Sequence, residues 1–204
     1  MTSRERVRKA VSFEEPDRVP IDLGGMKASG ISAITYDLLK KRLGLRTPTR
    51  ILDPRFMIAV VEEEILSRFH VDVLPVDLSG IQGQAAGKWV PRTLFDGTPV
   101  LFPPGTSIRE DADGGSTLMN ADGSASVFRM PRDGYYFDDT STNHGDGIDP
   151  MKFRPQSDIP DESLRPMGDY AHRLYRDTRS TLSWGGGSAC VSSGSASSRT
   201  AQTT

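Results

Sequence analysis

The sequence contains a single cysteine, Cys190, among its 204 residues. One thiol excludes an internal disulfide and a metal site built from cysteine pairs. The segment from Met1 to Arg6 lacks the apolar core of a secretory signal. No apolar run approaches the ~20 residues that cross a bilayer. We therefore expect a reducing, cytoplasmic setting and no contact with a membrane.

Neither sign of charge is in excess. The chain has 25 basic and 27 acidic side chains, which give a net charge of −2. We expect no nucleic-acid partner, because nucleic-acid-binding domains carry a basic patch or stripe. Apolar residues make up only 36% of the chain, against roughly 45–50% in typical domains with glycine counted. The 20 glycines and 14 prolines therefore place many residues in turns.

Acidic residues are missing after Asp177, and residues 178–204 are rich in Ser, Thr, Gly and Ala. Within residues 188–204, only Val191 is an aliphatic side chain larger than alanine. Such a segment cannot bury enough apolar surface to offset the entropy lost on ordering. Two interpretations remain open, a natural flexible tail and the product of a reading-frame change, and we favour the second.

Local patterns predict the order of helices and strands. Thr2 and Glu5 fit a capping box, Ser29 can cap the next helix, and Asp53-Pro54 and Asp161 fit two further helix starts. The expected helices cover residues 3–13, 30–43, 54–69 and 162–177, and strands are expected at residues 19–23, 71–76 and 180–184.

Between residues 87 and 138 the spacing becomes typical of β-structure. Four short strands are expected at residues 88–93, 98–102, 116–120 and 124–130. Asp-Gly pairs lie between them, and these pairs favour hairpin turns because they tolerate positive φ. We interpret this region as a small antiparallel β meander. The sequence Asp111-Ala112-Asp113-Gly114 within it is assigned to a turn rather than a calcium loop, since the required glutamate is missing.

Residues 4–25, RERVRKAVSFEEPDRVPIDLGG, carry a family resemblance. The segment resembles the opening of the uroporphyrinogen decarboxylase superfamily, most closely its divergent branch of decarboxylase-like and corrinoid-dependent methyltransferase proteins. The resemblance implies an α/β fold, a partial (β/α)8 TIM barrel with the β meander inserted, of which this chain is the amino-terminal portion. In such a barrel the chemistry lies at the carboxyl ends of the strands.

The resemblance also implies a division of the chain. Residues 1–86 would form the first βα units, 87–138 the inserted meander, 139–184 the return to the barrel, and 185–204 a disordered or frame-shifted tail. A (β/α)8 barrel needs about 250 residues. A truncated, catalytically inactive fragment is therefore one hypothesis for this chain.

Candidate site residues follow from the same resemblance. Porphyrinogen decarboxylases carry Met-Arg-Gln-Ala-Gly-Arg after the first strand, where this chain has residues 26–31, MKASGI. Met26 and Gly30 agree with that motif, Lys27 replaces the first arginine, and Ile31 replaces the second. Lysine offers a point charge where arginine offers a bidentate fork. The resemblance implies that Lys27 holds a substrate carboxylate, with Met26 and Gly30 beside it.

Two aspartates complete the expected site. Asp77, at the end of residues 71–76, matches the family aspartate that engages the pyrrole nitrogens and is the expected catalytic residue, while Asp22 would face the barrel mouth. Simpler interpretations stand beside these. Lys27 fits a solvated loop lysine, Asp77 fits a turn cap, and Asp22 fits a partner for the amides of Gly24 and Gly25. The neighbouring pair Asp17-Arg18 is interpreted as a structural salt bridge or cap.

Three functional hypotheses result. The first is decarboxylation of a tetrapyrrole carboxylate in porphyrin metabolism, without a cofactor in this chain. The second is corrinoid-dependent methyl transfer, in which zinc would be held by His and Cys; here His70, His144 and His172 are scattered and Cys190 stands alone. The third is the inactive fragment. The partner would be a tetrapyrrole or corrinoid small molecule, and the family allows a homodimer of the full-length protein.

Overall fold

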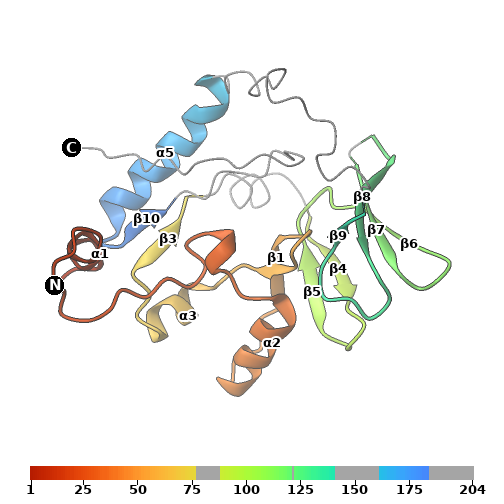
Figure 1. Ribbon diagram of the computed structural model, residues 1–204, viewed down its shortest axis with the longest axis horizontal. Coiled ribbons are helices and arrows are strands. Elements are labelled where there is room, and N and C mark those ends of the chain that lie inside the picture. The colour runs from red at the N-terminus through yellow and green to blue at the C-terminus, as the bar shows by residue number, and fades with distance from the viewer. Residues whose placement is uncertain (77–87, 121, 141–160, 184–204) are drawn as a thin grey trace.

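The computed structural model describes residues 1–76, 88–120, 122–140 and 161–183. Within these residues the chain has a mixed α/β fold with three separate β-sheets (Figure 1). Strands β6 to β9 lie at one end of the molecule, and α1, α5 and β10 lie at the other (Figure 1). Asp77, His144, Cys190 and the tail beyond residue 183 fall outside the described residues, as do the glycines at 185–187.

The first helix, α1 (Ser3–Val11), begins where the sequence predicts. Thr2 Oγ1 accepts from the amide of Glu5 at 3.2 Å, and Glu5 Oε2 accepts from the amide of Thr2 at 2.8 Å, which completes the capping box. The second helix, α2 (Ala33–Arg42), begins at Ser32 rather than at Ser29. Ser29 instead closes the short 3-10 turn η1 (Lys27–Ser29).

The central sheet has the strand order β2-β1-β5-β4. Its members are β1 (Thr49–Asp53), β2 (Ile58–Ala59), β5 (Pro99–Phe102) and β4 (Val90–Thr93). Strand β1 pairs antiparallel with β2 and parallel with β5, while β4 and β5 form an antiparallel hairpin. Buried side chains of β1, β5 and α2 form one core with Phe137.

A second sheet is antiparallel throughout and has the order β6-β7-β8-β9. It consists of β6 (Ile108–Glu110), β7 (Ser116–Met119), β8 (Ala125–Met130) and β9 (Asp138–Asp139). The expected meander is therefore divided between two sheets, because β4 and β5 add to the sheet of β1. The Asp-Gly turns at Gly97, Gly114 and Gly123 all have positive φ, as the sequence predicts.

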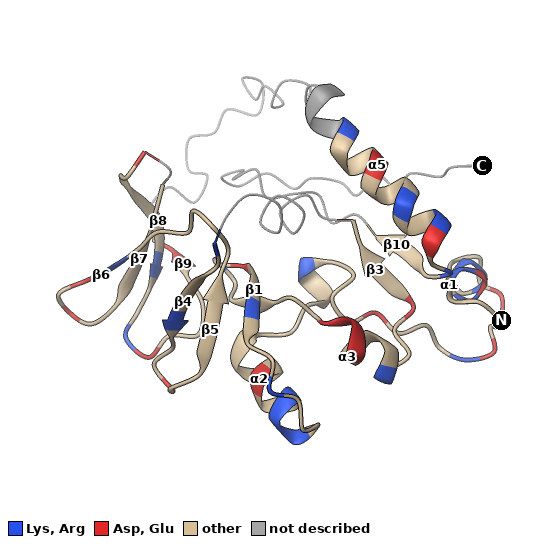
Figure 2. Ribbon diagram, turned by 180° about the vertical axis from the view of Figure 1, so that it is seen from behind, with Lys and Arg blue, Asp and Glu red and all other residues tan. Residues whose placement is uncertain are grey.

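The third sheet is a parallel pair, β3 (Val73–Pro75) with β10 (Thr181–Ser183). The helix α5 (Asp161–Asp177), which has the expected extent and contains Pro166, precedes β10. The short helix α3 (Glu63–Arg68) precedes β3 and carries Glu63 and Glu64 in its first turn, whereas α2 ends in Lys40, Lys41 and Arg42 (Figure 2). Each of these charges lies at the helix end where the macrodipole favours it.

The expected partial (β/α)8 TIM barrel is wrong. The described strands lie in three sheets and pair mostly antiparallel; β1–β5 and β3–β10 are the parallel pairs among them. The physical reason lies in the connections. Short turns join most consecutive strands, and a short turn can only reverse the chain, whereas a parallel pair needs a long crossover.

One element expected for a barrel is absent and another is shorter than expected. Residues 19–23 form no strand; Pro20 lacks a backbone donor, and the amide of Ile21 bonds the Asp72 side chain at 2.9 Å. The helix expected at residues 54–69 forms only as α3 (Glu63–Arg68), and residues 54–57 form a turn. Asp53 does cap the following segment, since its Oδ1 accepts from the amide of Phe56 at 3.1 Å, but that segment is the turn between β1 and β2.

Candidate functional site

The segment 24–29 lies between β3 and β1, at the carboxyl ends of both strands (Figure 1). It forms one wall of a small pocket of about 220 Å³, a volume that includes the solvent at its mouth. The residues lining this strand-end pocket come from the segment and from the two strand ends: Gly24, Gly25, Met26, Lys27, Leu52, Pro75 and Val76.

Two glycines allow close packing of the loop. Gly24 has a φ of 85°, and a Cβ there would meet Val61 Cγ2 at 2.9 Å. A Cβ on Gly25 would stand 2.5 Å from Asp22 Oδ1 and 2.6 Å from Val73 Cγ1 of β3. A larger residue at position 25 must therefore displace the loop or these two side chains, which would change the shape of the pocket.

Lys27 supplies the positive charge at the pocket. Its Nζ lies 2.7 Å from Asp53 Oδ2, and the two side chains are 23% and 7% exposed. Asp53 is the last residue of β1, and its other oxygen holds the amide of Phe56. The ammonium therefore has a fixed carboxylate neighbour and keeps partial access to solvent.

The pocket is too narrow to enclose a ligand group. A ligand carboxylate would therefore meet Lys27 from the solvent side, where 23% of the lysine side chain is exposed.

The other expected site residues have roles that differ from the expected ones. Asp22 Oδ1 accepts from the amide of Gly25 at 2.8 Å, which matches the simpler interpretation as a partner for the loop amides. Met26 lines the pocket and is 37% exposed. Gly30 packs against Ile58, because a Cβ there would approach Ile58 Cγ2 to 2.5 Å. Asp77 lies outside the described residues, so its role stays a prediction.

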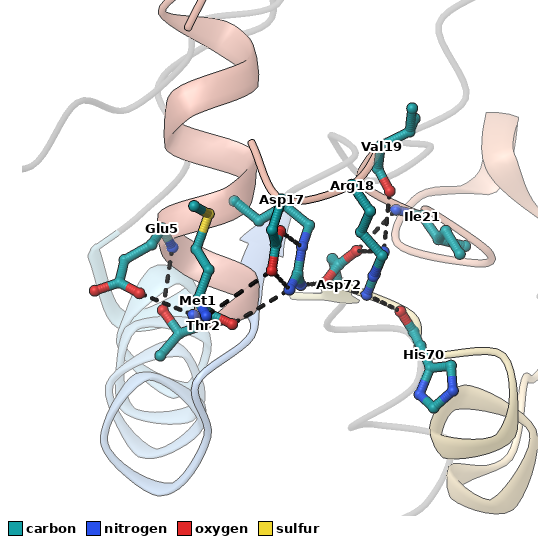
Figure 3. A network of polar contacts seen from close by, with 10 residues as sticks. Met1, Thr2, Glu5, Asp17, Arg18, Val19, Ile21, His70 and Asp72 are labelled. Carbon is teal, nitrogen blue, oxygen red and sulfur yellow. Dashed lines mark hydrogen bonds and ion pairs between the residues drawn. The ribbon is translucent and has the colours of Figure 1, made fainter. Parts of the chain in front are cut away.

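A second polar cluster joins the start of the chain to β3 (Figure 3). Its centre is Asp72, whose side chain is fully buried. Arg6 Nη1 lies 2.6 Å from Asp72 Oδ1, and Arg18 Nη1 lies 2.7 Å from Asp72 Oδ2. Arg6 also pairs with Asp17 at 2.5 Å. Asp17 and Arg18 thus have the structural role that we expected, but each pairs with a different residue rather than with the other.

The cluster holds its carboxylates in the charged form. Hydrogen bonds from Arg6 lower the pKa of Asp17 to about 2. Burial raises the pKa of Asp72, but hydrogen bonds from Ser3, the amide of Ile21, Arg18 and Arg6 together outweigh burial and lower it. Sequence reasoning missed Arg6 and Asp72, although a charged residue inside the apolar run 71–76 was a signal that it needed a partner.

The residues considered for metals do not form a site in the described part of the chain. There, no group of three or more His, Cys, Asp or Glu side chains could hold a metal ion. His70 has a φ of 53° at the end of α3, and its carbonyl accepts from Arg18 at 2.9 Å. His172 is exposed on α5. Asp111 and Asp113 lie in the turn after β6, as the sequence predicts, and both pair with Arg129 of β8.

No described helix is both long and apolar enough to span a bilayer. Comparison of the chain with known proteins finds no matching family model, no matching curated protein and no matching solved structure.

Proposed function

We propose that the protein binds a carboxylate group of a small-molecule ligand at the strand-end pocket, with Lys27 as the group that contacts it. The single observation that carries this proposal is the Lys27–Asp53 pair of 2.7 Å beside the backbone of Gly24 and Gly25. A partly exposed ammonium suits an anionic group that approaches it from solvent at the mouth of the pocket.

The resemblance of residues 4–25 to the uroporphyrinogen decarboxylase superfamily supports a particular ligand class and reaction. We propose a tetrapyrrole as the ligand and decarboxylation of one of its carboxylate side chains as the reaction. Lys27 would hold a side-chain carboxylate at the mouth of the pocket while the ring system stays in solvent. Asp77 would act on the pyrrole nitrogens, as the family resemblance implies.

The first test is direct binding of uroporphyrin, the stable oxidised form of such a ligand, followed by its fluorescence anisotropy. Lys27→Ala should weaken binding at least tenfold, because a charged contact that is lost costs 1.4 kcal/mol or more, about one tenfold step in affinity. Lys41→Ala is the matched control. Lys41 also forms a 2.7 Å pair with a buried aspartate, Asp37, but within α2 rather than at the pocket.

The reaction is tested separately by carbon dioxide release from chemically reduced uroporphyrinogen. Asp77→Asn should abolish turnover while binding persists. Binding that is the same in wild type and Lys27→Ala would overturn the assignment of Lys27. If uroporphyrin binds but no carbon dioxide is released, the protein binds carboxylates and the proposed decarboxylation is wrong.

One observation favours the alternative, corrinoid-dependent methyl transfer. Ile31 stands where the family has its second arginine, and the structure packs Ile31 against the core formed by Tyr36, Ala59 and Ile65. No second cation lines this pocket in the described residues. A substrate with many carboxylates would therefore gain less binding free energy here than in a site with two arginines. The alternative predicts demethylation of methylcobalamin in the presence of an added thiol, measured by the change in corrinoid absorbance. Since the described residues offer no zinc ligand group, no step is assigned to zinc.

A further inference from the structure

Both carboxylate oxygens of Asp53, the last residue of β1, have a partner. Its side chain is 7% exposed. Oδ1 accepts from the amide of Phe56 at 3.1 Å, and Oδ2 lies 2.7 Å from Lys27 Nζ. The amide of Phe56 belongs to the turn between β1 and β2, so the backbone itself sets the direction in which Asp53 faces Lys27.

The same contact places a negative charge next to any anion that reaches Lys27. A ligand carboxylate would share the ammonium with Asp53, and two like charges a few ångströms apart near a protein surface repel strongly. Asp53 therefore has two opposite effects on a bound carboxylate. It holds the lysine in position, and it weakens the attraction that this lysine exerts.

We propose that Asp53 is a positioning residue that limits the affinity of Lys27 for a carboxylate at the mouth of the strand-end pocket. This inference rests on the proposed function of Lys27 and deepens it. The site then selects a single carboxylate of moderate affinity rather than a cluster of anionic groups. Removing the charge of Asp53 while keeping its shape should increase the affinity for a simple carboxylate.

Asp53→Asn is the variant that separates these effects. Asparagine keeps an Oδ1 that accepts from the amide of Phe56, so the turn after β1 is retained, and only the charge opposite Lys27 is lost. Asp53→Ser is a second neutral variant, because a hydroxyl also accepts from a backbone amide, and it decides the outcome if Asp53→Asn does not fold. Asp53→Glu keeps the charge. Asp37→Asn is the matched control, since it removes the partner of Lys41 instead.

The probe is sodium propionate, titrated into 15N-lysine-labelled protein while the ammonium signal of Lys27 is followed by NMR. Lys27→Arg assigns that signal by removing it. In Asp53→Asn, half-saturation should occur at a propionate concentration about tenfold lower than in wild type, as expected for the loss of one neighbouring like charge. Asp53→Glu and Asp37→Asn should remain near the wild-type value.

Each outcome bears on the inference. Half-saturation at an equal or higher concentration in the neutral variants overturns it, because Asp53 would then not oppose the bound carboxylate. If Asp53→Asn binds propionate about tenfold more tightly and the wild-type protein does not bind uroporphyrin, the inference is supported and the tetrapyrrole is removed from the proposed function. Absence of any response of Lys27 to propionate overturns both.

Discussion

Arg6 Nη1 lies 2.6 Å from Asp72 Oδ1, and the pair joins the first helix to the residue before β3, 66 positions later in the chain. The Asp72 side chain is fully buried, and that of Arg6 is 9% exposed. Arg18 and the amide of Ile21 bond the same carboxylate (Figure 3). One aspartate therefore fixes α1 and the segment around residue 20 against β3, and that segment leads directly into the loop of the strand-end pocket.

Asp72→Ala should destabilise the fold by about 3 kcal/mol, because Arg6 and Arg18 lose the buried carboxylate that they share and Arg6 keeps only Asp17. Urea unfolding followed by circular dichroism measures this loss. Asp138→Ala, on the exposed strand β9, is the control and should change stability by no more than about 0.5 kcal/mol. A loss below about 1 kcal/mol for Asp72→Ala would show that the cluster does not hold the chain start in place.

Acid should weaken the same cluster. The pKa of Asp17 is lowered to about 2 from 3.8, chiefly by hydrogen bonds from Arg6. A folded-state pKa below the unfolded value means that the stabilisation is complete above the unfolded pKa and is lost as pH falls through the folded one. Stability should therefore hold above about pH 4 and fall between pH 4 and pH 2.

The variant that tests this pH dependence is Asp17→Asn. It should be less stable than wild type at pH 6 and approach wild type at pH 2, since protonation removes the same charge from the wild-type protein. Urea midpoints at pH 6, 4, 3 and 2 give the two curves. Curves that stay parallel over this range would contradict the assignment of the acid transition to Asp17.

Local features of the sequence predicted several elements of the fold. The capping box of Thr2 and Glu5 depends on residues three positions apart, so it is readable from the chain. The extent of α5 and the turns at Gly97 and Gly123 were predicted for the same reason. Position 53 shows what a local sequence pattern does not predict. An aspartate followed by proline fits a helix cap and a turn cap equally, and only the pairing of β1 with β2 decides between them.

Contacts between distant residues could not be predicted. The sequence suggested a ligand carboxylate as the partner of Lys27, and the structure pairs Lys27 with Asp53 of β1. The partner of Arg6 lies 66 residues away. The barrel was expected from a resemblance confined to the opening segment, whereas sheet order depends on connections along the whole chain.

Gly25→Ala should distort the pocket without abolishing folding. The new methyl group would stand 2.5 Å from Asp22 Oδ1 and 2.6 Å from Val73 Cγ1, and such overpacking costs about 1–3 kcal/mol. Propionate binding at Lys27 should fall with it, because the loop or these two side chains have to be displaced. Gly168→Ala is the control: position 168 lies within α5 with open space for a Cβ, so alanine should stabilise the helix by up to about 1 kcal/mol. Unchanged propionate binding in Gly25→Ala would contradict the close approach of the loop to the strand.

Alkaline pH should reveal the buried hydroxyl of Tyr36. Burial raises the pKa of Tyr36 to about 12, and its oxygen accepts from the amide of Glu62 at 2.8 Å. The unfolded tyrosine loses its proton near pH 10 while the folded one keeps it, so the unfolded state binds fewer protons and stability falls between pH 10 and pH 12.

Tyr36→Phe should be less stable than wild type by about 1 kcal/mol at pH 7, since the amide of Glu62 loses its acceptor. Its stability should then fall less steeply than that of wild type from pH 10 to pH 12. Lys40, whose pKa is lowered by burial beside the same ring, is present in both proteins, so the difference between the curves isolates the tyrosine. Guanidinium unfolding at pH 9, 10, 11 and 12 measures it, with the exposed Tyr135→Phe as the control. A Tyr36→Phe curve that runs parallel to wild type would mean that the hydroxyl ionises as readily in the folded protein as in the unfolded chain.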